Sequence, residues 1–132
     1  CLNAIRRQFE KVKLSADVCV FTITDNRITD AIRDAHARGV KIRVISDNDK
    51  SLDEGSDIQR LENLGIAVRV DRTRYHMHHK YAVFDQKTTL TGSYNWTRSA
   101  AEFNEENFVI TSDSRITKQF LNEFEKLWNS LS

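Results

Sequence analysis

The hydrophobic residues in the first half of the chain follow two alternating periods. Leu2, Ile5, Phe9 and Val12 recur at the spacing of one helix face, and a continuous β-branched run at 18–23 then indicates a buried strand. The same alternation returns twice before residue 71. In chain order it predicts helix 2–12, strand 18–23, helix 26–38, strand 40–45, helix 57–64 and strand 66–70, with the polar, acidic stretch 46–55 as a loop.

Capping residues support these boundaries. Asp25 or Asn26 can cap the second helix and Ser56 the third, while Gly39 and Gly65 provide the left-handed residue that ends a helix. Strands that alternate with helices are joined by right-handed crossovers, so this half is expected to form parallel strands covered on both faces.

The second half of the chain has a different pattern. The apolar runs 80–84 and 88–91 are separated only by Asp85, Gln86 and Lys87, which predicts a hairpin. Strand 108–110 and a long amphipathic helix follow. The inner face of this helix is expected to carry Ile116, Phe120, Phe124, Leu127, Trp128 and Leu131, and Trp96 is expected in the core. The fold class is therefore α/β: one domain, 1–132, with a mixed, mostly parallel sheet sandwiched between helices.

Composition narrows the class of protein only moderately. Charged residues make up 30% of 132 residues, but the net charge is +1, so binding to nucleic acid would need a local basic patch. Cys19 lies in a predicted strand, so a disulfide framework with Cys1 is not expected. No run of about 18 apolar residues is present, which predicts a soluble domain. Because the chain begins at Cys1, an upstream targeting or anchoring segment stays open, and the compartment is undetermined.

Candidate chemistry centres on His78 and Lys80. Two residues apart on a strand, their side chains are expected to point to the same face. An imidazole can attack phosphorus or transfer a proton near neutral pH, and an ammonium group can hold a phosphate oxygen. Downstream, Ser93 and Asn95 add hydrogen-bond donors, and Glu106 can accept a hydrogen bond from the His78 ring. The pattern indicates phosphoryl transfer.

These residues also carry a family resemblance. His78, Lys80 and Asp85 match the H-x-K-x4-D signature of the phospholipase D superfamily, and 92–95 matches its G-S-x-N element. The chain resembles the single-motif branch, which includes the Zucchini proteins, or mitochondrial cardiolipin hydrolases, and small bacterial nucleases. The resemblance implies that His78 forms a phosphohistidine, with the other roles divided as follows: Lys80 and Asn95 hold phosphate, Ser93 assists, Glu106 orients His78, and Asp85 is structural.

The single copy of the signature has a further implication. The mechanism of the family needs two histidines, so the resemblance implies a homodimer that joins two copies of His78 across a two-fold axis. Paired imidazoles should titrate together, with activity falling on both sides of neutrality. Two lysines and two histidines supply the positive charge, so neither a metal nor another cofactor is expected.

Other interpretations of the basic residues stay open. His76, His78 and His79 could form a zinc site, although ligands at this spacing on a strand alternate between its faces and no cysteine pair accompanies them. A basic, aromatic group could form a substrate-binding rim for a nucleic-acid strand, or could simply be a solvated loop. Its members are Arg72, Arg74, Tyr75, His76 and Lys87.

Three functions are consistent with these residues. The first is a metal-independent endonuclease acting on single-stranded RNA or DNA. The second is a phosphodiesterase that cleaves cardiolipin or a related phospholipid, and the third is an inactive dimeric scaffold that binds phosphate-rich partners. No residue in the sequence marks a contact to a 2′-hydroxyl, so the sequence does not choose between RNA and DNA.

Overall fold

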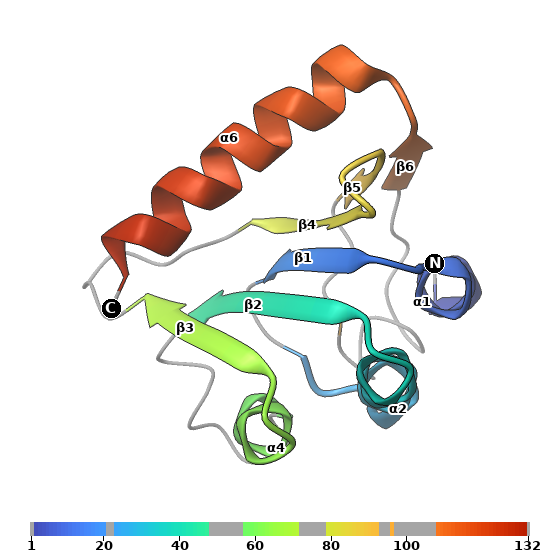
Figure 1. The fold of residues 1–132 in the computed structure, drawn as a ribbon, viewed down its shortest axis with the longest axis vertical. Helices are drawn as coiled ribbons and strands as arrows, with labels where there is room; N and C mark the ends of the chain where they lie inside the picture. The colour runs from blue at the N-terminus through green and yellow to red at the C-terminus, as the bar shows by residue number, and fades with distance from the viewer. Residues whose placement is uncertain are drawn as a thin grey trace.

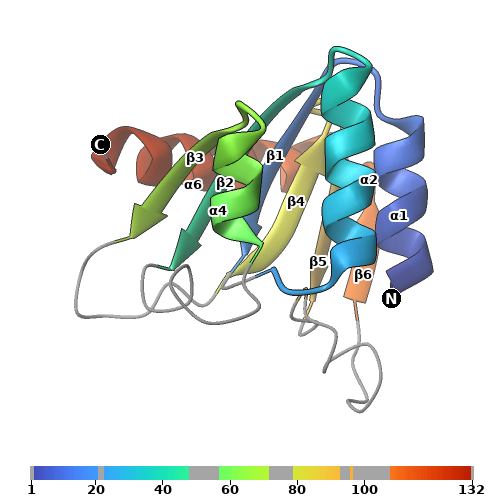
Figure 2. The same cartoon turned by 90° about the horizontal axis from the view of Figure 1, so that it is seen from below.

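The computed structural model describes residues 2–20, 23–47, 57–71, 79–92, 96 and 108–131. These residues form a six-stranded sheet between two layers of helices (Figure 1). One face is covered by α1 (Leu2–Lys11), α2 (Asn26–Ala37) and α4 (Ile58–Asn63), which lie side by side in Figure 2, and the other face by α6 (Ser114–Ser130). The strands are β1 (Ser15–Val20), β2 (Lys41–Asp47), β3 (Ala67–Asp71), β4 (Lys80–Phe84), β5 (Thr88–Gly92) and β6 (Phe108–Thr111).

The strand order is β3-β2-β1-β4-β5-β6, which confirms the predicted α/β class with a mixed sheet. The prediction that the sheet is mostly parallel is wrong. β1, β2 and β3 pair in parallel, but β4 is antiparallel to β1, and the β4–β5 and β5–β6 pairings are antiparallel as well. Parallel pairing is confined to the strands that helices α2 and α4 join, because a crossover helix returns the chain to the end of the sheet where the previous strand began. The tight turn between β4 and β5 instead reverses the strand direction.

Two strands extend beyond the apolar runs that predicted them. β1 begins at Ser15 rather than at residue 18, and β2 continues through Ser46 and Asp47, which were predicted as loop. Ser46 and Asp47 are buried and pair with residues 70 and 71 of β3. Backbone pairing with a neighbouring strand therefore sets these ends, and the polarity of the side chains does not.

The helix caps follow the sequence signals closely. The Asp25 carboxylate accepts a hydrogen bond from the Arg27 amide at 3.0 Å and caps α2. Gly39 and Gly65 adopt φ values of 94° and 86°, the left-handed conformation expected after a helix. Ser56, the predicted cap of α4, lies outside the described residues, and Asp57 occupies the N-cap position without a side-chain cap bond.

The hydrophobic core is divided by the sheet. The larger part lies under α1, α2 and α4 and includes Trp96, which is 1% exposed and packs edge-on against Phe9. The smaller part lies under α6, around Tyr81 and Phe124. Ile116 does not join it and is 41% exposed, because the buried position at the start of α6 belongs to Thr117, whose hydroxyl lies 2.8 Å from that of Thr89. No helix within the described residues is long and apolar enough to cross a lipid bilayer.

Candidate active site

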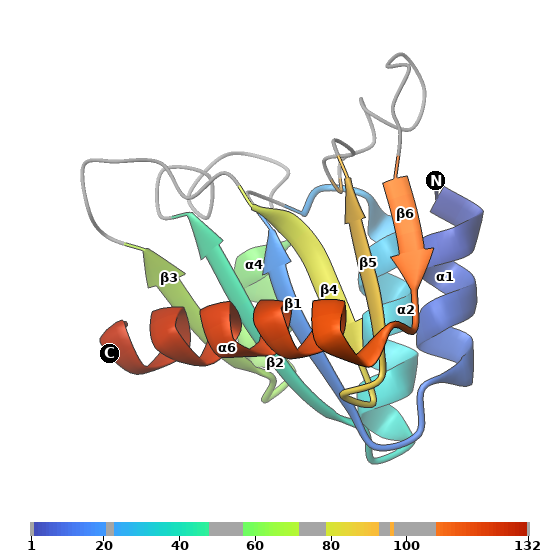
Figure 3. The same ribbon diagram turned by 90° about the horizontal axis from the view of Figure 1, so that it is seen from above.

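The strand directions bring several chain ends to one edge of the sheet. Val20 at the end of β1 pairs with Lys80 at the start of β4. In the same way Gly92 at the end of β5 pairs with Phe108 at the start of β6. In Figure 3 the arrows of β1, β2, β3 and β5 all point to this edge, and β4 and β6 begin there. We call it the Lys80 edge.

The signature residues of the sequence are connected to this edge. His78 precedes Lys80 by two residues, Ser93 directly follows Gly92, and Glu106 precedes Phe108 by two residues. These three residues and Asn95 lie outside the described residues, as do the predicted rim residues Arg72, Arg74, Tyr75 and His76. Three segments that are distant in sequence thus continue from strand ends that the structure places on adjacent strands.

Lys80 is the signature residue that the structure places at this edge. It is half-buried and begins β4, in register with Val20. Ala82 and Phe84 belong to the core under α1 and α2, whereas Tyr81 and Val83 belong to the core under α6. Because side chains alternate along a strand, Lys80 lies on the same face of β4 as Ala82 and Phe84.

Trp96 anchors the chain directly after Asn95. Its carbonyl accepts a hydrogen bond from the Thr24 amide at 3.0 Å, and the residue forms a parallel bridge with Ile23. Both contacts lie just beyond the end of β1 and before the first turn of α2. The backbone of Trp96, whose buried indole was predicted as core, therefore ties the residue after the G-S-x-N element to the segment that follows β1.

His79 lies on the α6 side of the sheet. Its ring contacts Tyr81 edge-on at 5.5 Å between centroids, and its Nε2 lies 3.9 Å from Glu123 of α6. The other two histidines of the zinc alternative, His76 and His78, lie outside the described residues. Within the described residues, no group of three or more His, Cys, Asp or Glu side chains could hold a metal ion.

Asp85 lies at the far end of β4 from Lys80, where its carboxylate binds the connection between α1 and β1. Oδ1 accepts hydrogen bonds from the amides of Leu14 at 2.6 Å, Ser15 at 3.1 Å and Lys13 at 3.2 Å. The Asp85 amide in turn donates to the Ser15 carbonyl at 2.7 Å. These contacts fasten the turn after β4 to the start of β1, and the structural role expected for Asp85 stays a prediction.

The turn that carries Asp85 is a tight hairpin. Asp85 and Gln86 adopt φ values of 55° and 56°, and the Lys87 amide donates to the Phe84 carbonyl at 3.0 Å. Positive φ at both central residues is the conformation that matches the twist of paired strands. Because this turn lies at the edge opposite Lys80, the structure does not bring Lys87, predicted as a substrate-binding residue, to the Lys80 edge.

Replacing Asp85 tests this structural role. Partial burial alone would raise the pKa of Asp85, but hydrogen bonds from the amides of Leu14, Ser15 and Lys13, with Lys87 nearby, hold it below the ordinary 3.8. We expect Asp85→Ala to lower the free energy of unfolding by about 1–3 kcal/mol, because three amides lose their acceptor. Asp85→Asn, which keeps one acceptor oxygen, should lose less. Urea denaturation at neutral pH measures both.

The same interaction predicts an acid dependence of stability. The folded-state pKa lies below the unfolded one, so the contribution of Asp85 is complete above the ordinary value and is lost as the pH falls through the folded value. Between about pH 5 and about pH 3 the parent chain should therefore lose more stability than Asp85→Asn. If the free energy of unfolding fell equally in the two proteins over this pH range, the assignment would be contradicted.

A partly buried ionic cluster under α6 was not predicted from the sequence. Arg43 of β2 donates to Asp17 of β1 at 2.8 Å and to Glu125 of α6 at 2.6 Å. Burial by itself lowers the pKa of Arg43, but the two carboxylates outweigh it and raise the pKa above its ordinary value. The guanidinium also lies over the rings of Phe124 and Trp128, at 4.8 and 5.4 Å. The signal in the sequence that could have indicated this cluster was Asp17, a single aspartate at the start of an apolar run.

Comparisons with known proteins identify the family. The sequence profile described as "Cardiolipin synthase, PLD-like domain" matches residues 5–128. The fold and this match define a domain of the PLD-like class. The chain belongs to the phospholipase D-like family, as its signature indicated.

Two curated relatives are both mitochondrial cardiolipin hydrolases. The chain is 48% identical over 113 residues to the mitochondrial cardiolipin hydrolase of Chlamydomonas reinhardtii, covering 86% of this chain and 51% of that protein. It is 37% identical over 131 residues to the mitochondrial cardiolipin hydrolase of Homo sapiens, covering 99% of this chain and 52% of that protein. The chain thus spans about half the length of the curated relatives it matches.

Solved structures share the fold closely. Nuc from Salmonella typhimurium, a phospholipase D family member, superimposes with a TM-score of 0.90 at 26% identity, covering 98% of this chain and 88% of that one. NucT from Helicobacter pylori superimposes with a TM-score of 0.91 over the same shares of the two chains, at 24% identity.

Proposed function

We propose that this chain is a metal-independent phosphodiesterase that acts through a phosphohistidine at His78, with single-stranded RNA or DNA as its substrate. The observation that carries the proposal is the Lys80 edge. Lys80 is held there in the sheet, and the segments that contain the remaining signature residues continue from adjacent strand ends. A cation and a nucleophile at one edge of a sheet are what phosphoryl transfer requires.

In the proposed reaction an imidazole nitrogen of His78 attacks phosphorus, and the bond from phosphorus to the leaving oxygen breaks. The second His78 of the dimer gives its proton to that oxygen. Water then attacks the phosphohistidine and loses a proton to the same second histidine. This step breaks the bond from phosphorus to nitrogen, releases a phosphate monoester and restores both rings. Lys80 and Asn95 hold the non-bridging oxygens, Ser93 assists them, and Glu106 accepts a hydrogen bond from the ring of His78.

The homodimer is part of the proposal because the signature occurs once in the chain. Two copies related by a two-fold axis would supply two histidines and two lysines to one phosphate. Four positive or ionisable groups around one phosphate would stabilise the added charge of the transition state without a divalent metal.

The substrate is proposed from the sequence around the site. Arg72, Arg74, Tyr75 and His76 directly precede the signature and combine cations with an aromatic ring, a composition suited to a single strand. A second candidate, hydrolysis of cardiolipin or a related phospholipid, is supported by the name of the curated relatives.

A substrate panel separates these candidates. Purified chain would be incubated with labelled single-stranded RNA, single-stranded DNA and cardiolipin vesicles, each with a chelator present. We expect cleavage of nucleic acid that the chelator does not reduce. Rapid hydrolysis of cardiolipin with intact nucleic acid would favour the second candidate. Binding to all three without cleavage would favour the inactive scaffold.

Replacing Lys80 tests the charge at the proposed phosphate site. We expect Lys80→Ala to lower kcat/KM by about 10²–10³-fold, the usual effect of removing one group that stabilises transition-state charge. Lys80→Arg keeps the charge and should retain more activity. Lys126→Ala, an exposed lysine of α6, is the matched control and should leave kcat/KM unchanged. Equal losses for the alanine variants at positions 80 and 126 would contradict the assigned role.

A further inference from the structure

The edge of the sheet opposite Lys80 carries an exposed leucine among lysines. Leu14, in the connection between α1 and β1, is 70% exposed, and Lys13 next to it is exposed too. The Lys41 amide donates to the Leu14 carbonyl at 3.0 Å, and Asp85 accepts from the Leu14 amide at 2.6 Å. Three connections, α1–β1, α2–β2 and β4–β5, therefore meet at this edge (Figure 3).

Four lysines surround the leucine, and all are exposed. Lys11 is the last residue of α1, Lys13 lies in the α1–β1 connection, Lys41 begins β2 and Lys87 lies in the hairpin turn. We call Leu14 with Lys11, Lys13, Lys41 and Lys87 the Leu14 patch. These lysines form no ion pair within the described part of the chain, although Lys87 lies near the Asp85 carboxylate and Lys41 near that of Glu125. The four ammonium groups outnumber the carboxylate of Asp85, which is bound to backbone amides. The patch therefore presents a local positive charge despite the near-neutral chain.

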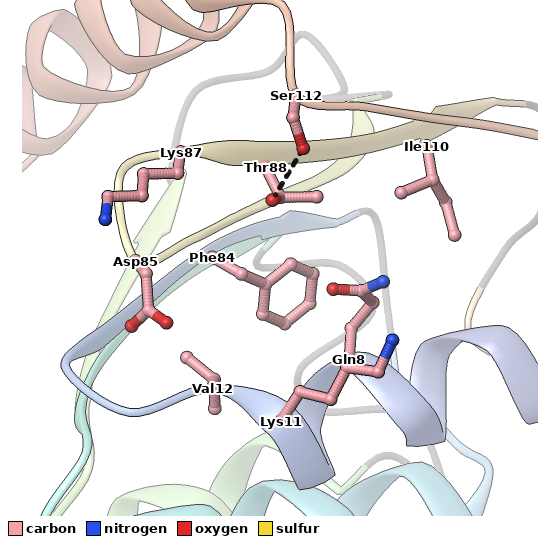
Figure 4. A pocket seen from close by; sticks show the side chains of 9 residues that line it. All are labelled: Gln8, Lys11, Val12, Phe84, Asp85, Lys87, Thr88, Ile110 and Ser112. Atoms are coloured by element: carbon pink, nitrogen blue, oxygen red, sulfur yellow. Dashed lines mark hydrogen bonds between the residues drawn. The ribbon is translucent and has the colours of Figure 1, made fainter.

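A hollow of about 310 Å³ adjoins the patch (Figure 4). Lys11 and Lys87 lie on its rim, and its floor includes the ring of Phe84 with Val12. Its polar lining also includes the hydroxyls of Thr88 and Ser112, 3.1 Å apart, the amide of Gln8 and the amide-bound carboxylate of Asp85. Ammonium groups above an apolar floor suit a ligand with a phosphate group next to a less polar segment.

We propose that the Leu14 patch docks this domain on an anionic lipid surface, with Leu14 entering the headgroup region and the lysines facing lipid phosphates. An exposed aliphatic side chain next to several lysines can contribute to membrane binding in two ways. The apolar side chain is buried in the lipid, and the lysines are attracted to anionic headgroups. A polynucleotide strand is better matched by aromatic rings and arginine planes. The patch itself has a leucine and four lysines instead.

The docked orientation has a consequence for the proposed active site. β4 runs from Lys80 at one edge to Phe84 beside Asp85 at the other, so the Leu14 patch and Lys80 lie at opposite edges of the sheet. A domain bound through the patch would turn Lys80 away from the lipid and toward water. This orientation suits a dissolved substrate, and it depends only on the position of Lys80 in the fold.

Vesicle sedimentation tests the proposal. The His78→Asn chain, used so that turnover cannot interfere, would be mixed with phosphatidylcholine vesicles with and without about 30% phosphatidylglycerol. We expect binding only to the anionic vesicles, weakened by salt. Removing two charges with Lys13→Gln and Lys87→Gln together should weaken it about thirtyfold, and Leu14→Ser should weaken it as well. Arg6→Gln with Arg7→Gln, two charges from the middle of α1, is the matched control and should bind like the parent.

Several results would overturn the proposal. Equal binding to neutral and anionic vesicles, no binding at low salt, or an equal loss in the Arg6 and Arg7 control would each do so. If the Lys13 and Lys87 variant kept its vesicle binding and lost retention of single-stranded RNA, the patch would be a nucleic-acid surface. Leu14→Trp gives an independent measurement, because its fluorescence should shift to the blue relative to the parent only when anionic vesicles are added.

Discussion

His78→Asn is expected to lower kcat by roughly 10³-fold or more on whichever phosphodiester the substrate panel identifies. Asparagine preserves the approximate size and hydrogen bonding of histidine. It can neither attack phosphorus nor donate a proton to the leaving oxygen. Single-turnover kinetics with the parent chain should also trap a phosphorylated protein that His78→Asn does not form. Undiminished turnover in this variant would refute the assigned nucleophile.

Subunit mixing tests whether one site needs both copies of His78. In a randomly assorted mixture of equal amounts of the parent and the His78→Asn variant, about a quarter of the dimers contain two copies of His78. Activity near a quarter of the parent value is therefore expected, whereas independent sites would leave about half. The parent should also show a bell-shaped pH profile of kcat/KM, because one imidazole has to be neutral and the other protonated. A strictly monomeric parent would contradict the composite site.

Arg43→Met is expected to cause the largest loss of stability, about 3–5 kcal/mol in the free energy of unfolding. The Asp17 side chain is only 2% exposed and accepts from Arg43 at 2.8 Å, so removing the guanidinium leaves a buried carboxylate without its counter-charge. The variant also loses the packing of Arg43 on Phe124 and Trp128. Chemical denaturation followed by far-ultraviolet circular dichroism measures the change.

Two further variants identify the cause of that loss. Glu125→Gln removes the half-exposed partner of Arg43 and should cost no more than about 1 kcal/mol. The double variant Asp17→Leu with Arg43→Met removes both buried charges and should recover much of the stability, since a buried pair can often be replaced by apolar residues. If the double variant were as unstable as Arg43→Met alone, lost packing rather than the isolated carboxylate would be responsible.

Local signals in the sequence predicted elements well where neighbouring residues decide the structure. The β4–β5 hairpin follows from two apolar runs on either side of a three-residue spacer, and the start of α2 follows from the cap at Asp25. These features depend on hydrogen bonds within a few residues, such as Asp25 to the Arg27 amide. Sequence periodicity is informative over such distances.

Predictions failed where a distant partner decides the structure. Ser46 and Asp47 look like loop, yet they extend β2 because β3 lies alongside. Asp17 is buried within β1 because Arg43 neutralises it from the next strand. Ile116 was expected on the inner face of α6, but Thr117 takes the buried position opposite Thr89. None of these partners is a neighbour in the sequence.

By itself, the sequence determined the α/β class, the phospholipase D-like family and the signature residues, because periodicity and motif spacing are properties of the chain order. Only the tertiary structure decided the balance of parallel and antiparallel pairings and the position of Lys80 and Asp85 in the sheet. These two residues belong to one short motif, but β4 separates them, and Asp85 instead binds amides 70 to 72 residues away. The Leu14 patch arises in the same way, because folding, not sequence proximity, brings three connections together at one edge.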